Sequence, residues 1–205
     1  MIIEAKSLGK KYAREWIFRG MNAKFKLGAP TAIIGPNGSG KSTLLQILSG
    51  YHLATEGEVN YTIDSKQIAA EDVFQFLSIS APYLELVEEL SLDELLDFHF
   101  KFKPLLNGLD SEQFKEISLL SNQGKKEIRQ FSSGMKQRLK LALCFFTESK
   151  ACLLDEPTSN LDSTGVAWYQ EHVQSIVKDK VLIICSNQKH EYECCKEHLL
   201  IPNYK

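Results

Sequence analysis

The stretch Gly35-Pro36-Asn37-Gly38-Ser39-Gly40-Lys41-Ser42 decides the fold of this chain. It places two glycines around four residues and then adds Lys and Ser, which is the phosphate-loop pattern. The apolar run 31–34 before it predicts a buried strand, and Leu44, Leu45 and Leu48 after it have helical spacing. This order of strand, loop and helix is the context that the pattern requires, so we expect a phosphate-binding loop rather than a chance glycine-rich turn.

Each residue type in this loop has a physical role. The glycines let backbone N–H groups turn inward around phosphate oxygens, and the start of the helix adds a favourable dipole. Lys41 would supply a positive charge near the β- and γ-phosphates of a nucleotide. The hydroxyl of Ser42 suits a Mg²⁺ ligand.

A pair of carboxylates ends a second buried strand, at Leu153-Leu154-Asp155-Glu156. Asp155 would hold Mg²⁺ through water, and Glu156 would polarise the attacking water as general base. Alone, such a tetrad is explained by a solvated strand end. Its meaning comes from its occurrence together with the phosphate loop in a parallel-sheet setting.

The order of the elements indicates an α/β fold. Val181–Cys185 predicts a third buried strand, and Val166, Tyr169 and Val173 before it mark a helical face. Near-continuous apolar strands alternating with helices favour a parallel sheet covered by helices. The first 30 residues and roughly Gly57 to Ile63 instead alternate in polarity and carry turn residues, as small antiparallel strands do.

The middle of the chain predicts helices. Ser91-Leu92-Asp93-Glu94 has the pattern of a capping box, and Ser111 is expected to cap a second helix. Phe131-Ser132-Ser133-Gly134-Met135-Lys136-Gln137-Arg138 opens a third, amphipathic helix. Ser133 and the first free N–H groups of this helix would suit a second anion. An ordinary serine N-cap is the alternative, and taken alone the segment favours the cap.

Together these motifs resemble the nucleotide-binding domains of ABC ATPases, over nearly the whole chain. Gly35–Thr43 is similar to the family's Walker A motif, and Asp155–Thr158 is similar to Walker B with its catalytic glutamate. Phe131–Met135 is similar to the signature motif, and Ser159–Asp162 is similar to the D-loop. The resemblance implies a mainly parallel core sheet, a small antiparallel β subdomain and an inserted α-helical subdomain. We expect one domain over 1–205, with its core in 1–80 and 148–205 and its helical part in 81–147.

The resemblance also implies how such a chain works. Two chains would pair head to tail as a homodimer or heterodimer and enclose two ATP molecules with Mg²⁺. Each ATP would lie between the Walker A motif of one chain and Ser132, Ser133 and Gly134 of the other. Tyr12 would stack on the adenine, although a tyrosine at a strand edge is the alternative interpretation.

Three positions depart from the family's pattern. The run Ser78–Tyr83 contains no glutamine where the family's Q-loop glutamine is expected, which puts Mg²⁺ coordination and coupling to the membrane partner in question. Asn187 stands where the family has its H-loop histidine, so we expect it to act in catalysis together with Glu156 and Lys41. Because asparagine replaces histidine, ATP hydrolysis is expected to be slow. The signature carries Ser133 and Met135 where Gly and Gln are usual, a milder change.

Composition limits the remaining possibilities. A net charge of -2 gives no reason to expect a nucleic-acid partner, and the five cysteines show no metal-ligand spacing. No apolar run approaches the ~20 residues of a membrane span. The sequence therefore predicts an ATP-hydrolysing subunit at the cytoplasmic face of a membrane, working with a separate transmembrane permease subunit. The alternative is a nucleotide-gated regulatory or non-transport ABC ATPase with weak turnover.

Overall fold

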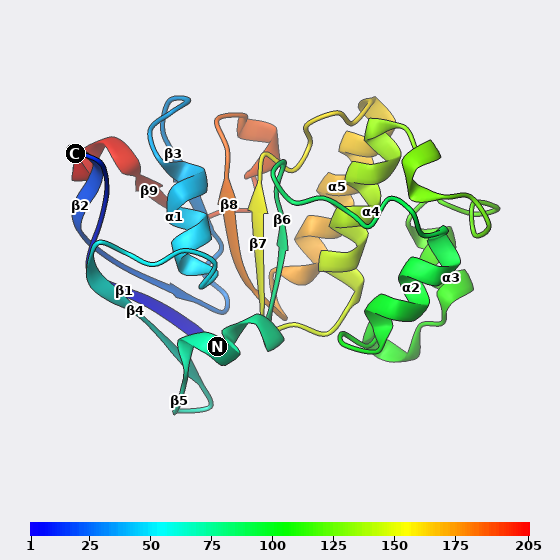
Figure 1. The fold of residues 1–205 in the computed structure, drawn as a ribbon, viewed down its shortest axis with the longest axis horizontal. Coiled ribbons are helices and arrows are strands. Elements are labelled where there is room, and N and C mark those ends of the chain that lie inside the picture. The colour runs from blue at the N-terminus through cyan, green and yellow to red at the C-terminus, as the bar shows by residue number, and fades with distance from the viewer.

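A five-stranded parallel sheet forms the centre of the computed structural model, which describes residues 1–205 (Figure 1). Its strands follow the order β6-β7-β8-β3-β9, so that β3 and β7 both lie next to β8. The bounds of these strands are β3 Thr31–Ile34, β6 Leu77–Ser80, β7 Ala151–Asp155, β8 Val181–Cys185 and β9 Glu197–Leu200. All four pairings in this sheet are parallel, which confirms the predicted α/β class.

A second sheet is antiparallel and lies on one side of the parallel sheet (Figure 1). Its order is β2-β1-β4-β5, and its bounds are β1 Ile2–Tyr12, β2 Glu15–Lys26, β4 Glu56–Ile63 and β5 Lys66–Ile68. The alternating polarity of the first 30 residues had predicted such strands, and their pairing confirms it.

Helices lie mainly on the opposite side, with α1 between the two sheets (Figure 1). Their bounds are α1 Lys41–Leu48, α2 Leu92–Phe100, α3 Ser111–Ile117, α4 Ser133–Phe146 and α5 Ser163–Ile176, with short 3-10 turns η1 Ala70–Gln75, η2 Leu106–Gly108, η3 Ile128–Gln130, η4 Lys189–Glu191 and η5 Ile201–Tyr204. None of the helices has the length and apolarity needed to cross a bilayer.

The helix caps decide where the helical segments begin. Ser91 and Glu94 form the predicted capping box at the start of α2. The predicted cap at Ser111 is wrong, because Asp110 accepts the hydrogen bond from the N–H of Gln113 and Ser111 is the first helical residue. Asp and Ser are both favoured at the N-cap position, so the observed helix begins one residue earlier than predicted.

The strands of the parallel sheet are buried on both faces. Ile33, Leu153 and Ile183 pack into a core with α1 and the antiparallel sheet. Their neighbours along the strands belong to a second core with α2 to α5, as the alternation of side chains in a strand requires. The parallel sheet therefore packs against the antiparallel sheet and α1 on one face and against α2 to α5 on the other.

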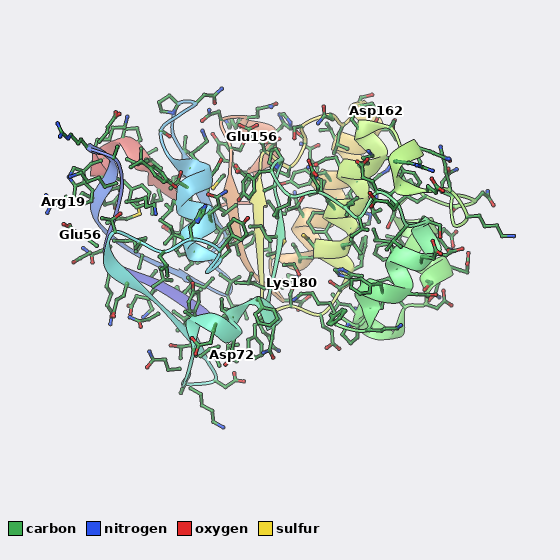
Figure 2. The ribbon with its side chains drawn as sticks, in the orientation of Figure 1. Arg19, Glu56, Asp72, Glu156, Asp162 and Lys180 are labelled. Atoms are coloured by element: carbon green, nitrogen blue, oxygen red, sulfur yellow. The ribbon has the colours of Figure 1, made fainter.

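The buried Lys180, labelled at the lower end of the sheet in Figure 2, closes the end of α4. Its Nζ donates hydrogen bonds to the carbonyl oxygens of Cys144 at 2.8 Å, Phe145 at 3.3 Å and Thr147 at 2.8 Å. The last carbonyls of a helix have no partner inside the helix, so that this ammonium group supplies the missing donors.

Lys180→Met should therefore destabilise the fold. The methionine keeps the volume but leaves buried carbonyl groups without donors, and we expect a loss of roughly 2–3 kcal/mol in the free energy of unfolding. Urea unfolding followed by circular dichroism measures this loss. The matched control is Lys178→Met, at an exposed position of the same turn. Equal midpoints for the two variants would contradict the role of Lys180.

Candidate functional site

The carboxyl ends of three adjacent strands meet at one edge of the parallel sheet. The phosphate loop 35–40 follows β3, Glu156 follows β7, and Ser186 follows β8. The N–H of Glu156 donates to the carbonyl of Cys185 at 2.9 Å, and the N–H of Ser186 donates to the carbonyl of Ile33 at 3.2 Å. These bonds tie the three segments together at the edge where open α/β sheets bind ligands.

The conformation of the phosphate loop depends on its glycines. Gly38 and Gly40 have φ angles of 77° and 104°, which residues with side chains rarely adopt. A Cβ atom on Gly40 would also lie 2.2 Å from Cγ2 of Ile17 in β2. The backbone of the loop at Gly40 therefore lies directly against Ile17 of the antiparallel sheet, which a residue with a side chain would not allow.

Lys41 is the cation of the loop, and 5% of its surface is exposed. Its Nζ donates to the carbonyl oxygen of Gly35 at 2.8 Å and to that of Pro36 at 3.3 Å. The ammonium group is thus held at the wall of a hollow of about 220 Å³. The hollow is lined by Ile17, Asn37, Gly38, Gly40, Lys41, Ser42, Thr43 and Glu156. Apart from Ile17 and Glu156, its lining residues offer backbone amides, hydroxyls, a side-chain amide and one ammonium group, which include the donors that phosphate oxygens need.

Asp155 has a buried carboxylate that lacks a full set of partners. Its exposed fraction is 2%, and Oδ1 has no hydrogen-bond partner in the structure. Burial raises the pKa of the Asp155 carboxyl above its ordinary value, while a hydrogen bond with Ser42 opposes the shift and the nearby Glu156 adds to it. A divalent cation between Asp155 and Ser42 would offset this burial, so that the donor set fits Mg²⁺.

Glu156 follows directly, and Figure 2 labels it at the end of β7. Its φ angle of 45° lies in the left-handed region, which costs a residue with a side chain roughly 1–3 kcal/mol. Its carbonyl accepts from both the N–H and the hydroxyl of Ser159, which hold the turn in place. The strained turn places Glu156 among the residues that line the hollow.

Asn187 lies beside the phosphate loop. Its side-chain Nδ2 donates to Oδ1 of Asn37 at 2.9 Å. His190 does not take this place, because its Nε2 lies 3.1 Å from the hydroxyl of Thr158. The structure thus brings Asn187, Lys41 and Glu156 to one edge, and their catalytic roles stay predictions.

Two groups of predicted residues lie outside the hollow. The side chain of Ser132 caps α4 by accepting from the N–H of Met135 at 3.2 Å, and neither Ser133 nor Gly134 lines the hollow. Tyr12 is 46% exposed at the end of β1 and does not line the hollow either.

Sequence reasoning missed two residues near the site. Ile17 packs against Gly40 and lines the hollow, but an isoleucine in a strand carries no signal of this. Tyr83 follows β6, the neighbour of β7. Burial and then the charge of Asp155 raise the pKa of the Tyr83 phenol above its ordinary value. Only the strand order could have revealed it.

Comparisons with known proteins agree with this geometry. The family described as ABC transporter matches residues 18–159. The lantibiotic transport ATP-binding protein SrtF of Streptococcus pyogenes is 30% identical over 191 residues, which are 91% of this chain and 80% of that protein. The uncharacterised ABC transporter ATP-binding protein YybJ of Bacillus subtilis is 30% identical over 194 residues, covering 93% of this chain and 87% of that protein.

The fold has solved counterparts. The dimeric structure of MJ0796, a bacterial ABC transporter cassette, superposes with a TM-score of 0.82 at 21% identity. The match covers 97% of this chain and 93% of that one. The phosphate loop, the acidic strand end and the family match point the same way: this chain belongs to the ABC transporter family and is an ATP-binding subunit of such a transporter.

Proposed function

We propose that this subunit hydrolyses ATP, with Mg²⁺ held by Ser42 and Asp155. The phosphate loop and Lys41 would hold the β- and γ-phosphates, and Glu156 would take the proton of the attacking water. The observation that carries this proposal is the unpartnered Oδ1 of Asp155 at the edge where β3, β7 and β8 meet. A buried carboxylate oxygen without a donor is costly unless a ligand or cation reaches it.

A second ATP-binding chain would complete the site. Ser132, Ser133 and Gly134 open α4, away from the hollow of their own chain. Their first N–H groups and the helix dipole suit a phosphate supplied by the other chain of a head-to-tail pair. Tyr12, exposed at the edge of the molecule, would then stack on the adenine.

The transmembrane subunit would dock beside the segment 83–98. A cavity of about 370 Å³ lies there between β6 and α4, lined mainly by apolar side chains such as Phe74, Leu84 and Leu86. Phe74 is 63% exposed at its rim. An exposed aromatic beside an apolar cavity is typical of a protein-interaction site. The relative named for lantibiotic transport favours a lantibiotic as the substrate of the complete assembly.

The test is a steady-state ATPase assay of the purified chain, with Mg²⁺ and then with excess EDTA. We expect release of phosphate that depends on Mg²⁺. Phosphate release that is unaffected by EDTA would contradict the magnesium site. ATP binding with no release under any condition would favour a regulatory module instead.

Asn187→His should accelerate hydrolysis. Asn187 lies at the phosphate loop but cannot carry a positive charge or shuttle a proton, whereas a histidine can. A preorganised donor at the transition state is worth roughly 3–4 kcal/mol, so we expect kcat to rise by about 10² with little change in KM. The control Lys189→His adds a histidine at an exposed position two residues later. A histidine variant that hydrolyses ATP no faster than the parent would show that Asn187 has a structural role after β8 and none in catalysis.

A further inference from the structure

The carboxylate of Glu191 is buried in the interior, with an exposed fraction of 1%. Oε1 accepts hydrogen bonds from the N–H of Thr158 at 2.8 Å and from the hydroxyl of Thr158. Oε2 accepts from the hydroxyl of Ser186. The backbone carbonyl of Glu191 accepts from the hydroxyl of Tyr169 in α5 at 2.6 Å, which fixes the turn η4 that carries it. One side chain thus joins two segments that are far apart in the sequence.

These two segments lie next to Glu156 and Asn187, which are predicted to act on ATP. Thr158 lies two residues after Glu156, and Ser186 lies directly before Asn187. Between them, the backbone N–H of Glu156 bonds to the last strand residue Cys185. The carboxylate of Glu191 therefore links the segment after the proposed general base Glu156 to the segment that carries Asn187.

The same loop is held from its other side. Nε2 of the buried Gln137 in α4 donates to the carbonyl oxygen of Pro157 at 2.8 Å. Pro157 and Thr158 are thus fixed by neighbours on two different elements, α4 and η4. The strained φ angle of Glu156 persists only where the surroundings hold it, and these contacts supply that restraint.

Stability alone is a poor explanation for this carboxylate. A buried charge is costly to remove from water, and none of the ion pairs in the structure includes Glu191. It is compensated by hydroxyl and amide donors only, all of which come from the two segments beside the site. Such an arrangement favours a role for Glu191 in positioning the site residues, because each of its hydrogen bonds fixes a segment beside the site.

We propose that Glu191 is a positioning residue for ATP hydrolysis, which sets the distance between Glu156 and the Asn187 turn by bridging Thr158 and Ser186. This inference rests on the proposed function. General-base catalysis requires the base within hydrogen-bond reach of the water, and a displacement of about 1 Å can cost about 100-fold in rate. Nucleotide binding depends instead on the phosphate loop, which Glu191 does not touch.

The test compares Glu191→Gln with the parent and with Glu193→Gln, an exposed control two residues later. The glutamine keeps the shape and can still accept from Thr158, but it presents an NH₂ group to Ser186. We expect the single-turnover rate of ATP hydrolysis, measured with protein in excess, to fall at least about tenfold. The dissociation constant of a fluorescent ATP analogue should change less than about twofold, and Glu193→Gln should match the parent in both measurements.

Ser186→Ala provides the second variant, because it removes only the serine arm of the bridge. If the two residues act as one unit, the double variant should be no slower than the slower single variant. A lower melting temperature with an unchanged hydrolysis rate would show a purely structural role and overturn the inference, as would equal rates for the parent and Glu191→Gln. A parent that binds ATP but releases no phosphate would overturn the proposed function itself, and this inference with it.

Discussion

Lys41→Ala is expected to abolish ATP hydrolysis and to weaken ATP binding at least about 30-fold. Lys41 is the only cation that lines the hollow at the phosphate loop. Truncating one partner of a buried charge pair costs roughly 2–5 kcal/mol, and 1.4 kcal/mol corresponds to about a factor of ten. The developing charge of the transition state loses the same support, so that binding and turnover fall together.

Equilibrium titration with a fluorescent ATP analogue and a phosphate-release assay measure the two effects. The control is Lys66→Ala, at an exposed position of β5 in the antiparallel sheet. Because Lys41 also bonds to the carbonyl groups of Gly35 and Pro36, the fold of the variant should be checked by circular dichroism. A folded variant with nearly unchanged affinity would contradict the assignment of the phosphate loop.

Glu156→Gln should separate ATP binding from ATP consumption. The amide keeps the size of the carboxylate but cannot take a proton, and loss of a positioned base costs a factor of roughly 10²–10⁴ in rate. The phosphate loop is unchanged, so ATP should remain bound. A trapped ATP would hold two chains together, since each γ-phosphate would contact both chains.

Light scattering with ATP and Mg²⁺ measures this association. We expect the Glu156→Gln chain to shift from monomer to dimer, and the double variant with Lys41→Ala, which lacks the phosphate contact, to stay monomeric. Hydrolysis by Glu156→Gln at the parental rate would contradict the role of Glu156. A Glu156→Gln chain that stays monomeric at high concentration with ATP bound would exclude the homodimer and leave pairing with a different ATP-binding chain.

The local motifs could be predicted because each of them is encoded in consecutive residues. The phosphate loop needs glycines at fixed positions, and Gly40 has the φ angle and the close contact that only glycine allows. The apolar runs before Gly35 and Glu156 are buried strands, as their composition predicted. The cap of α3 was misplaced by one residue, because Asp110 and Ser111 both suit such a position.

Contacts between distant segments could not be predicted. The carboxylate of Glu191 meets Thr158 and Ser186 only because β7 and β8 are neighbours and η4 folds back behind them. In the sequence, Glu191 is one of several acidic residues near the end of the chain. Tyr83 is brought close to the acidic strand for a similar reason, since it follows the strand that pairs with β7. Strand order, which the motifs do not encode, decides both positions.

The start of α4 has almost no clearance from the loop that follows β7. A Cβ atom on Gly134 would lie 2.9 Å from the carbonyl oxygen of Asn160, so the two backbones are in direct contact. Together with the bond from Gln137 to Pro157, this contact couples the position of the helix to that of the loop. In a head-to-tail pair, a chain whose loop relaxes after hydrolysis would withdraw its helix from the ATP of its partner.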